Sequence, residues 1–248
     1  MITIYLKQYN KIVRNPDLKM FEELGYDDIL WIDLLNPTIK EQKEVENFME
    51  INLQTSQEVE EIEITSKYFE TENAVFTNVN FFVHKAEGFV VEPVSFVVTE
   101  GILITVRNSD FRTFNEAEKR LQMNYRAYPT GYHMLISILE IRIDADADTV
   151  ELVSKQIAAL SAAISTADKV SQDEIKNISK LQENTMLIRE VIFDRQRVLS
   201  GILKSERFPN DVYPRLQLMI RAINPIISHS DLSFERAPLL RETDPSPS

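Results

Sequence analysis

The second half of this sequence carries an apolar pattern that only very long α-helices satisfy. From Leu135 to Ile164, apolar residues recur at intervals of three and four for about eight helical turns. An average globular helix has about three turns. A second run with the same spacing extends from Ile175 to Ile202. Because each apolar face needs a partner, we predict an antiparallel hairpin of two long helices.

Helix-start signals indicate where two of the helices begin. Ser171 and Glu174 have the spacing of a capping box at the start of the second long helix. Thr38 and Glu41 repeat that spacing, and we predict a helix from there to about Met49. The local sequence therefore supplies side-chain acceptors for the free amides of both helix starts.

Two more helices are predicted outside the hairpin. Residues 111–124 form one amphipathic segment, and a last helical stretch starts near Asp211. That stretch contains Pro225, which we expect to kink or end it. The tail, residues 237–248, is polar and rich in Pro and Ser, so we expect it to be disordered.

The first half of the sequence is typical of β-strands. Alternating or β-branched runs predict strands at Ile2–Leu6, Lys11–Arg14 and Ile29–Leu34. Four further strands are predicted at Tyr68–Thr71, Ala74–His84, Val90–Val98 and Ile102–Val106. Turn signals at Gly88 and Gly101 join the later strands into antiparallel hairpins. Strands followed by helices predict the α+β fold class.

Several enzyme signatures are missing from the sequence. It has no cysteine, which excludes disulfides, thiolate catalysis and Cys-based zinc sites and fits a reducing compartment. Its five glycines form neither a P-loop nor a GxGxxG fingerprint. The three histidines, His84, His133 and His229, have no HExxH spacing, and we interpret each as an ordinary strand-face or helix-surface residue. An enzyme is therefore the least favoured class.

The charge balance constrains the partners. Lys and Arg total 27 against 39 Asp and Glu, a formal charge of −12 that argues against nucleic acid and favours cations or basic partners. The N-terminus lacks the features of a signal peptide. No run approaches the roughly 18 apolar residues of a membrane span, so we expect the chain as given to be soluble.

Acidic residues gather in two places. Four carboxylates fall within Glu58–Glu63, and Glu140, Asp144 and Asp148 recur at four-residue intervals on the first long helix. Like charges at this spacing repel by a few tenths of a kcal/mol per pair, so such stripes either stay in water or hold a cation. Asp146 weakens the same helix further without an evident local benefit. Carboxylates without thiolates or clustered imidazoles suit Mg²⁺ or Ca²⁺.

Four sequence strings occur in the order of these segments: Trp31–Thr38, Pro93–Val98, Ile102–Arg107 and Asp146–Glu151. Together with that order, they resemble the cytoplasmic domain of the CorA family of magnesium transporters. The resemblance spans about residues 1–235. It implies an αβα sandwich with a mixed, largely antiparallel sheet, followed by long stalk-like helices. The implied division is an αβα domain at 1–165 and a helical stalk at 166–236.

The resemblance also implies a function and a set of site residues. In this family, Mg²⁺ bound between neighbouring cytoplasmic domains of a homopentamer holds the pore shut, and loss of the ion opens it. Glu60 and Glu61 are similar to the acidic pair on one face of that interface, and Glu140 falls where the sandwich supplies an acid nearby. Asp211 resembles the stalk acid of the adjoining subunit. We add Asp144 from the four-residue stripe.

The family continues through two membrane helices with a Gly-Met-Asn signature, and this sequence contains neither. We therefore expect a fragment that lies on the cytoplasmic side of the cell membrane, reaches the membrane only through a missing C-terminal segment, and cannot conduct ions alone. Three alternatives stay open. One is a zinc or cobalt transporter domain of the same family, with Zn²⁺ or Co²⁺ in place of Mg²⁺. Another is a soluble helical interaction protein without metal function, and the last is a metal-dependent hydrolase.

Overall fold

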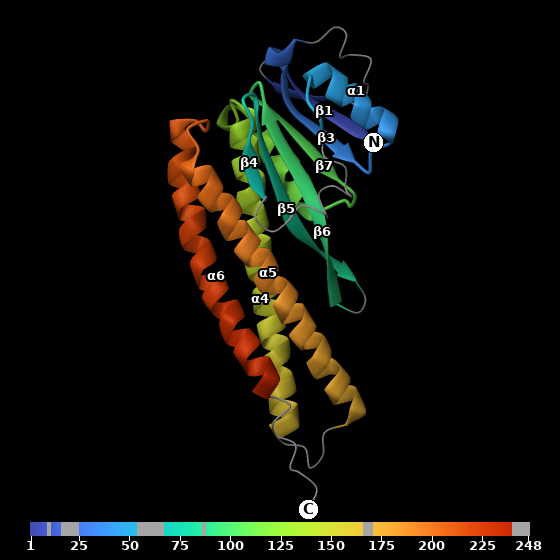
Figure 1. Cartoon of the computed structure of the whole chain (residues 1–248), viewed down its shortest axis with the longest axis vertical. Coiled ribbons are helices and arrows are strands. Elements are labelled where there is room, and N and C mark those ends of the chain that lie inside the picture. The colour runs from blue at the N-terminus through green and yellow to red at the C-terminus, as the bar shows by residue number, and fades with distance from the viewer. Residues whose placement is uncertain (9–10, 16–24, 54–66, 86–87, 166–170, 240–248) are drawn as a thin grey trace, which may run out of the picture.

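The computed structural model describes residues 1–8, 11–15, 25–53, 67–85, 88–165 and 171–239. A sheet forms one end of the molecule, and three long helices extend well beyond it (Figure 1). Glu60 and Glu61, together with the rest of the first acidic cluster, lie outside the described residues.

The sheet has seven strands in the order β2-β1-β3-β7-β6-β5-β4. The strands are β1 (Ile2–Gln8), β2 (Lys11–Asn15), β3 (Ile29–Leu35), β4 (Tyr68–Glu70), β5 (Ala74–Lys85), β6 (Gly88–Thr99) and β7 (Ile102–Arg107). Every neighbouring pair is antiparallel except β3 and β7, which are parallel with Ile32 opposite Ile104. The predicted mixed, largely antiparallel sheet is confirmed.

Helices cover both faces of the sheet. Helix α1 (Ile39–Met49) packs Val45 and Met49 into a core with the strand residues on one face. Helices α3 (Arg112–Met123) and α4 (Gly131–Ser165) pack against the other face, where Trp31 is fully buried. Because successive strand residues point to opposite faces, both sides of β3 are apolar and both are covered. This is the predicted αβα sandwich.

The long helices run side by side beyond the sheet (Figure 1). Helix α4 is followed by α5 (Gln172–Lys204), and α6 (Tyr213–Leu239) packs against both. Short 3₁₀ turns occur at η2 (Tyr26–Asp28), η4 (Tyr125–Ala127) and η5 (Asn210–Val212). The predicted helical hairpin is confirmed. Helix α4 packs on the sheet as well as on α5 and α6, so it belongs to both parts of the molecule. The domain boundary at residue 165 stays a prediction.

Both predicted capping boxes are present. The backbone N–H of Glu41 donates to Thr38 Oγ1 at 3.2 Å, and the amide of Thr38 donates to Glu41 Oε2 at 2.7 Å. The N–H of Glu174 likewise donates to Ser171 Oγ at 3.2 Å, and the amide of Ser171 donates to Glu174 at 2.7 Å. These bonds satisfy amides that have no partner inside the helix.

Helix α6 does not end at Pro225 but continues to Leu239. An interior proline costs about 3 kcal/mol or more, because it removes one hydrogen bond and crowds the preceding turn. Ile223 and Ile226 are buried on either side of it, and burying each such side chain contributes about 1.5–3 kcal/mol. Packing therefore offsets the local penalty. Residues 237–239 of the predicted tail are helical, and 240–248 lie outside the described residues.

A buried ion triad joins α4, α5 and the sheet. Asp146 is fully buried and accepts hydrogen bonds from Arg142 Nε and Arg195 Nε, each at 2.7 Å. Arg195 Nη2 also donates to the backbone carbonyl of Asn80 on β5. The aspartate that weakens the helix locally is therefore the counter-charge of two buried arginines.

Candidate metal centre

Three of the predicted metal ligands lie among the described residues. Glu140 and Asp144 are one turn apart on α4, and Asp211 lies in η5, immediately before α6. Each carboxylate has different surroundings.

Glu140 lies where three helices meet. Its Oε2 accepts a hydrogen bond from Arg215 Nη2 on α6 at 2.8 Å, and Arg120 Nη1 on α3 is 4.0 Å from the same oxygen. The side chain is 31% exposed. Two arginines from different helices thus neutralise this carboxylate within one chain, and a cation bound at Glu140 would have to compete with them.

Asp144 lies one turn further along α4, on the exposed side. Partial burial raises the pKa of this carboxyl group, and the negative charges of Glu140 and Asp148 raise it further, while Arg120 opposes them. The predicted repulsion along the stripe is therefore present. Asp144 and Asp148 line a groove of about 650 Å³ between α3 and α4, where a divalent cation would relieve the repulsion.

Asp211 pairs with a buried histidine. His133 Nε2 is 3.0 Å from Asp211 Oδ2, and His133 Nδ1 is 2.9 Å from Thr130 Oγ1. The hydrogen bond from His133 holds the pKa of Asp211 below its ordinary value. The Asp211 side chain is 69% exposed while that of His133 is 7% exposed. The Asp211 carboxylate is thus ionised and oriented by the buried His133, and its remaining surface is open to a ligand.

The sequence interpretation of His133 as an ordinary surface residue was wrong. His133 is buried at the start of α4 and contacts a residue 78 positions away. No local pattern indicates such a pairing. The side chains of the other two histidines lie outside the described part of the structure.

Two side-chain contacts, one hydrogen bond and one salt bridge, lie along one seam between α4 and the start of α6, which we call the α4–α6 seam. It consists of His133 with Asp211 and Glu140 with Arg215. His133 and Glu140 are two turns apart on α4, or about 10 Å along the axis. Among the residues that the structure describes, no three His, Asp or Glu side chains gather into a set that could hold a metal ion. The described acids of one chain thus do not by themselves form a metal site.

The family model and the similar proteins identified by sequence point to the same family. A family model described as CorA-like Mg²⁺ transporter protein matches residues 26–246. The magnesium transport protein CorA of Campylobacter jejuni (strain RM1221) is 29% identical over 241 residues, covering 93% of this chain and 74% of that protein. The protein of the same name from Wolinella succinogenes is 28% identical over 240 residues, covering 94% and 74%.

Solved structures share the fold. The complete CorA magnesium transporter of Methanocaldococcus jannaschii has a TM-score of 0.79 at 10% identity, over 98% of this chain and 76% of that chain. The soluble domain of the same transporter has a TM-score of 0.74 at 12% identity, over 98% and 95%. The ZntB cytoplasmic domain of Vibrio parahaemolyticus has a TM-score of 0.68 at 11% identity, over 97% and 94%. Within the described ranges, no helix is both long and apolar enough to cross a membrane.

Proposed function

We propose that this chain, which belongs to the CorA-like Mg²⁺ transporter family, is the part of a divalent-cation transporter that senses Mg²⁺ and controls gating. The family match over residues 26–246 and the fold of a CorA soluble domain support this assignment. The role is regulatory and requires no catalysis. In the whole transporter this part lies on the cytoplasmic side of the cell membrane, which the likeness to a ZntB cytoplasmic domain supports.

The observation that carries the proposal is the α4–α6 seam. Asp211 and Glu140 are held by His133 and Arg215 inside the chain, yet Asp211 keeps most of its surface open. Mg²⁺ prefers carboxylate oxygens and retains several of its waters, so two or three acids from separate chains suffice to bind it. We infer a site shared between neighbouring subunits of a homopentamer, with Glu60 and Glu61 of one subunit facing Asp211 of the next.

Metal binding at this site is coupled to the seam. An ion at Asp211 or Glu140 attracts the same oxygens that His133 and Arg215 contact, so it weakens the internal pairs that join α4 to the start of α6. Loss of the ion restores those pairs. A ligand shifts a conformational equilibrium only through such a difference in interaction between two states.

Thermal unfolding and sedimentation of the purified chain test this proposal. With about 10 mM MgCl₂, against NaCl of equal ionic strength, we expect a higher unfolding temperature and a larger sedimenting species, because an ion that binds only the folded assembly stabilises it. The variant Glu61→Gln with Asp211→Asn should lose both effects. Glu183→Gln with Glu190→Gln, two exposed acids on α5, is the matched control. Equal responses of the parent and the Asp211 variant would refute the site.

A second candidate is a domain that responds to Zn²⁺ or Co²⁺, because the fold also matches the ZntB cytoplasmic domain. The absence of cysteine counts against strong zinc binding. Repeating the titration with ZnCl₂ and CoCl₂ separates the two, since the Mg²⁺ proposal expects an effect of Mg²⁺ when no transition metal is present. A helical interaction protein without metal function would show no metal effect at all.

A further inference from the structure

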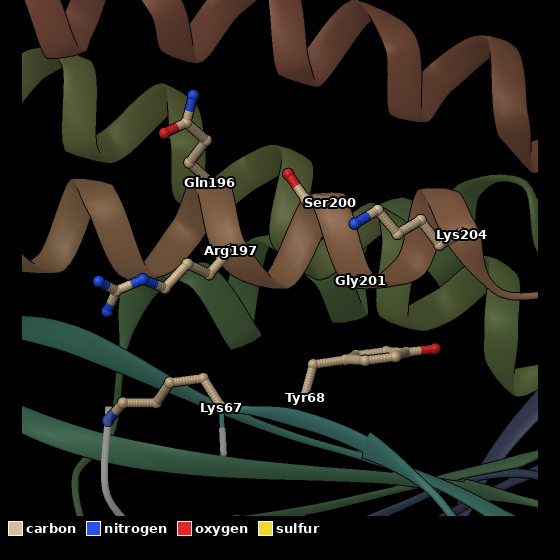
Figure 2. Close-up of a pocket in the computed structure, with 7 residues that line it drawn as sticks. All are labelled: Lys67, Tyr68, Gln196, Arg197, Ser200, Gly201 and Lys204. Atoms are coloured by element: carbon tan, nitrogen blue, oxygen red, sulfur yellow. The ribbon is translucent and has the colours of Figure 1, made fainter. Parts of the chain in front are cut away.

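A basic pocket lies between the start of β4 and the last turns of α5, on elements that carry none of the proposed metal ligands (Figure 2). Its volume is about 330 Å³. Among the described residues, the charged side chains that line it are Lys67, Arg197 and Lys204, and none of the lining residues is acidic. The chain as a whole has a formal charge of −12, so a pocket lined by three cations differs in sign from the rest of the molecule.

The α5 wall of the pocket is one face of the helix. Arg197, Ser200, Gly201 and Lys204 line it, at the three-, four- and seven-residue spacings that place side chains on the same side. Helical periodicity therefore places these residues on the same wall of the pocket. In Figure 2 the side chains of Arg197 and Lys67 extend in the same direction, one from α5 and the other from the sheet side.

The floor of the pocket depends on Gly201. A Cβ atom at this position would lie 2.6 Å from Tyr68 Cδ1, closer than real side chains approach, so glycine is what allows the tyrosine ring to lie against α5. The Tyr68 hydroxyl donates to Glu70. The ring thus contributes an apolar floor and leaves the binding of charge to the surrounding cations.

The charges around the pocket do not balance. Asp194 is buried behind the lining, with Lys67 Nζ at 3.7 Å and Arg197 Nη1 at 3.3 Å. Glu70, which accepts from the Tyr68 hydroxyl, is paired with Arg207. Lys204 has no acidic partner among the described residues, and it is exposed. Among the described side chains, the three cations that line the pocket have one carboxylate, Asp194, within salt-bridge distance, which leaves a local excess of positive charge. The side chain of Lys67 is only 11% exposed, so water screens its charge poorly.

We propose that this pocket binds a soluble anion bearing one or two phosphate groups. Arginine presents a planar pair of donors that suits phosphate oxygens, and lysine adds a compact point charge. Gln196 and Ser200, which also line the pocket, supply neutral donors. The volume lies at the lower end of small-molecule sites, which suits a small phosphorylated compound. Because Lys67 lies beside β4 and the other cations lie on α5, a bound anion would contact both the αβα sandwich and the helical hairpin.

The position of the pocket favours a soluble ligand over a lipid headgroup. It lies near the end of α5 from which α6 starts, and α6 runs from there to the opposite end of the molecule (Figure 1). A membrane reached through the C-terminal side of the chain would lie at that opposite end, away from the pocket. The pocket is also separate from the α4–α6 seam. The proposal therefore stands whether or not the Mg²⁺ assignment is correct.

Calorimetric titration with sodium pyrophosphate tests the proposal, in divalent-free buffer with about 150 mM NaCl to screen weak surface attraction. We expect saturable binding by the parent chain. The variant Arg197→Ser with Lys204→Ser should bind about tenfold or more weakly, because each lost charge-assisted bond removes a comparable factor. The control Lys155→Ser with Lys176→Ser removes two exposed cations elsewhere on the long helices and should bind like the parent.

Several results would overturn the proposal. One is the absence of saturable binding by the parent, and another is an equal loss of affinity in both double variants. Equal binding of sulfate and pyrophosphate would identify an adventitious ion only. Sedimentation with phosphatidylglycerol vesicles that depends on Arg197 and Lys204, without pyrophosphate binding, would assign the pocket to a lipid headgroup. Unfolding without ligand checks each variant, and Arg197 and Lys204 are exposed enough to be replaced without loss of the fold.

Discussion

Replacing Asp146 by Asn removes the counter-charge of two buried arginines. Arg142 and Arg195 both donate to this carboxylate at 2.7 Å, and their side chains are 6% and 1% exposed. Arg195 also lies 5.1 Å from the centre of the Phe81 ring, and burial lowers its pKa. Arg195 is buried between α4, α5 and β5, so its guanidinium cannot reach water without displacing that packing. The charge therefore stays buried and loses its partner.

The expected cost follows from that geometry. Removing one partner of a buried ion pair typically destabilises a protein by about 3–5 kcal/mol. For a chain of this size each kcal/mol shifts the unfolding temperature by about 2–4 °C, so the total shift should be about 6–20 °C. Thermal and urea unfolding followed by circular dichroism measure both quantities. The control is Asp148→Asn two residues away, which is exposed and should change stability by no more than about 0.5 kcal/mol.

A second variant separates the charge effect from a packing effect. Replacing the triad together, with Arg142→Met, Asp146→Leu and Arg195→Met, removes all three buried charges while keeping similar volumes. Arg195 Nη1 is buried without a hydrogen-bond partner among the described residues, so methionine also removes an unsatisfied donor. We expect the triple variant to be more stable than Asp146→Asn. If Asp146→Asn lies within about 1 kcal/mol of the parent, the triad does not hold α5 on the sheet as argued.

Three further predictions concern other contacts. Arg215→Gln removes the nearer of the two arginines at Glu140, so half of the Mg²⁺-induced rise in unfolding temperature should occur at lower Mg²⁺ than in the parent. Stability should change by under about 1 kcal/mol, and an unchanged or higher midpoint would contradict competition at this acid. The backbone of Thr38 lowers the pKa of Glu41, so this acid contributes stability above its unfolded pKa that is lost as pH falls through the depressed folded pKa. The difference in urea stability between the parent and Glu41→Gln should therefore be present at neutral pH and shrink toward pH of about 3, and a constant difference would argue against it. Gly201→Ala should cost about 1–3 kcal/mol in the same assay because its methyl group meets the Tyr68 ring, and a neutral result would show that the ring moves freely.

The elements of this fold were predictable because their signals are local. The capping boxes at Thr38 and Ser171 begin helices α1 and α5 in the structure. Apolar spacing likewise predicted both long helices. Pro225 shows where a local rule fails, because the penalty it imposes is smaller than the burial gained by the rest of α6.

The candidate site was predictable only as a set of residue types. Four-residue spacing placed Glu140 and Asp144 on one side of a helix, and the structure confirms their position on α4. The sequence spacing could not reveal that Arg215 pairs with Glu140, or that His133 contacts Asp211. The basic pocket was missed altogether, because Lys67 and Lys204 are far apart in the chain and neither belongs to a motif.

The sequence by itself determined the class of fold, the strands, the long helices and a chain rich in carboxylates that suits a hard cation, since periodicity, capping and composition act between near neighbours or over the whole chain. The tertiary structure alone decided which polar and charged side chains face one another. Glu140 and Arg215 are 75 residues apart, and His133 and Asp211 are 78 apart. Contacts at such separations arise only when α4 and α6 pack, because Coulomb attraction depends on distance in space and on burial, neither of which the order of residues specifies.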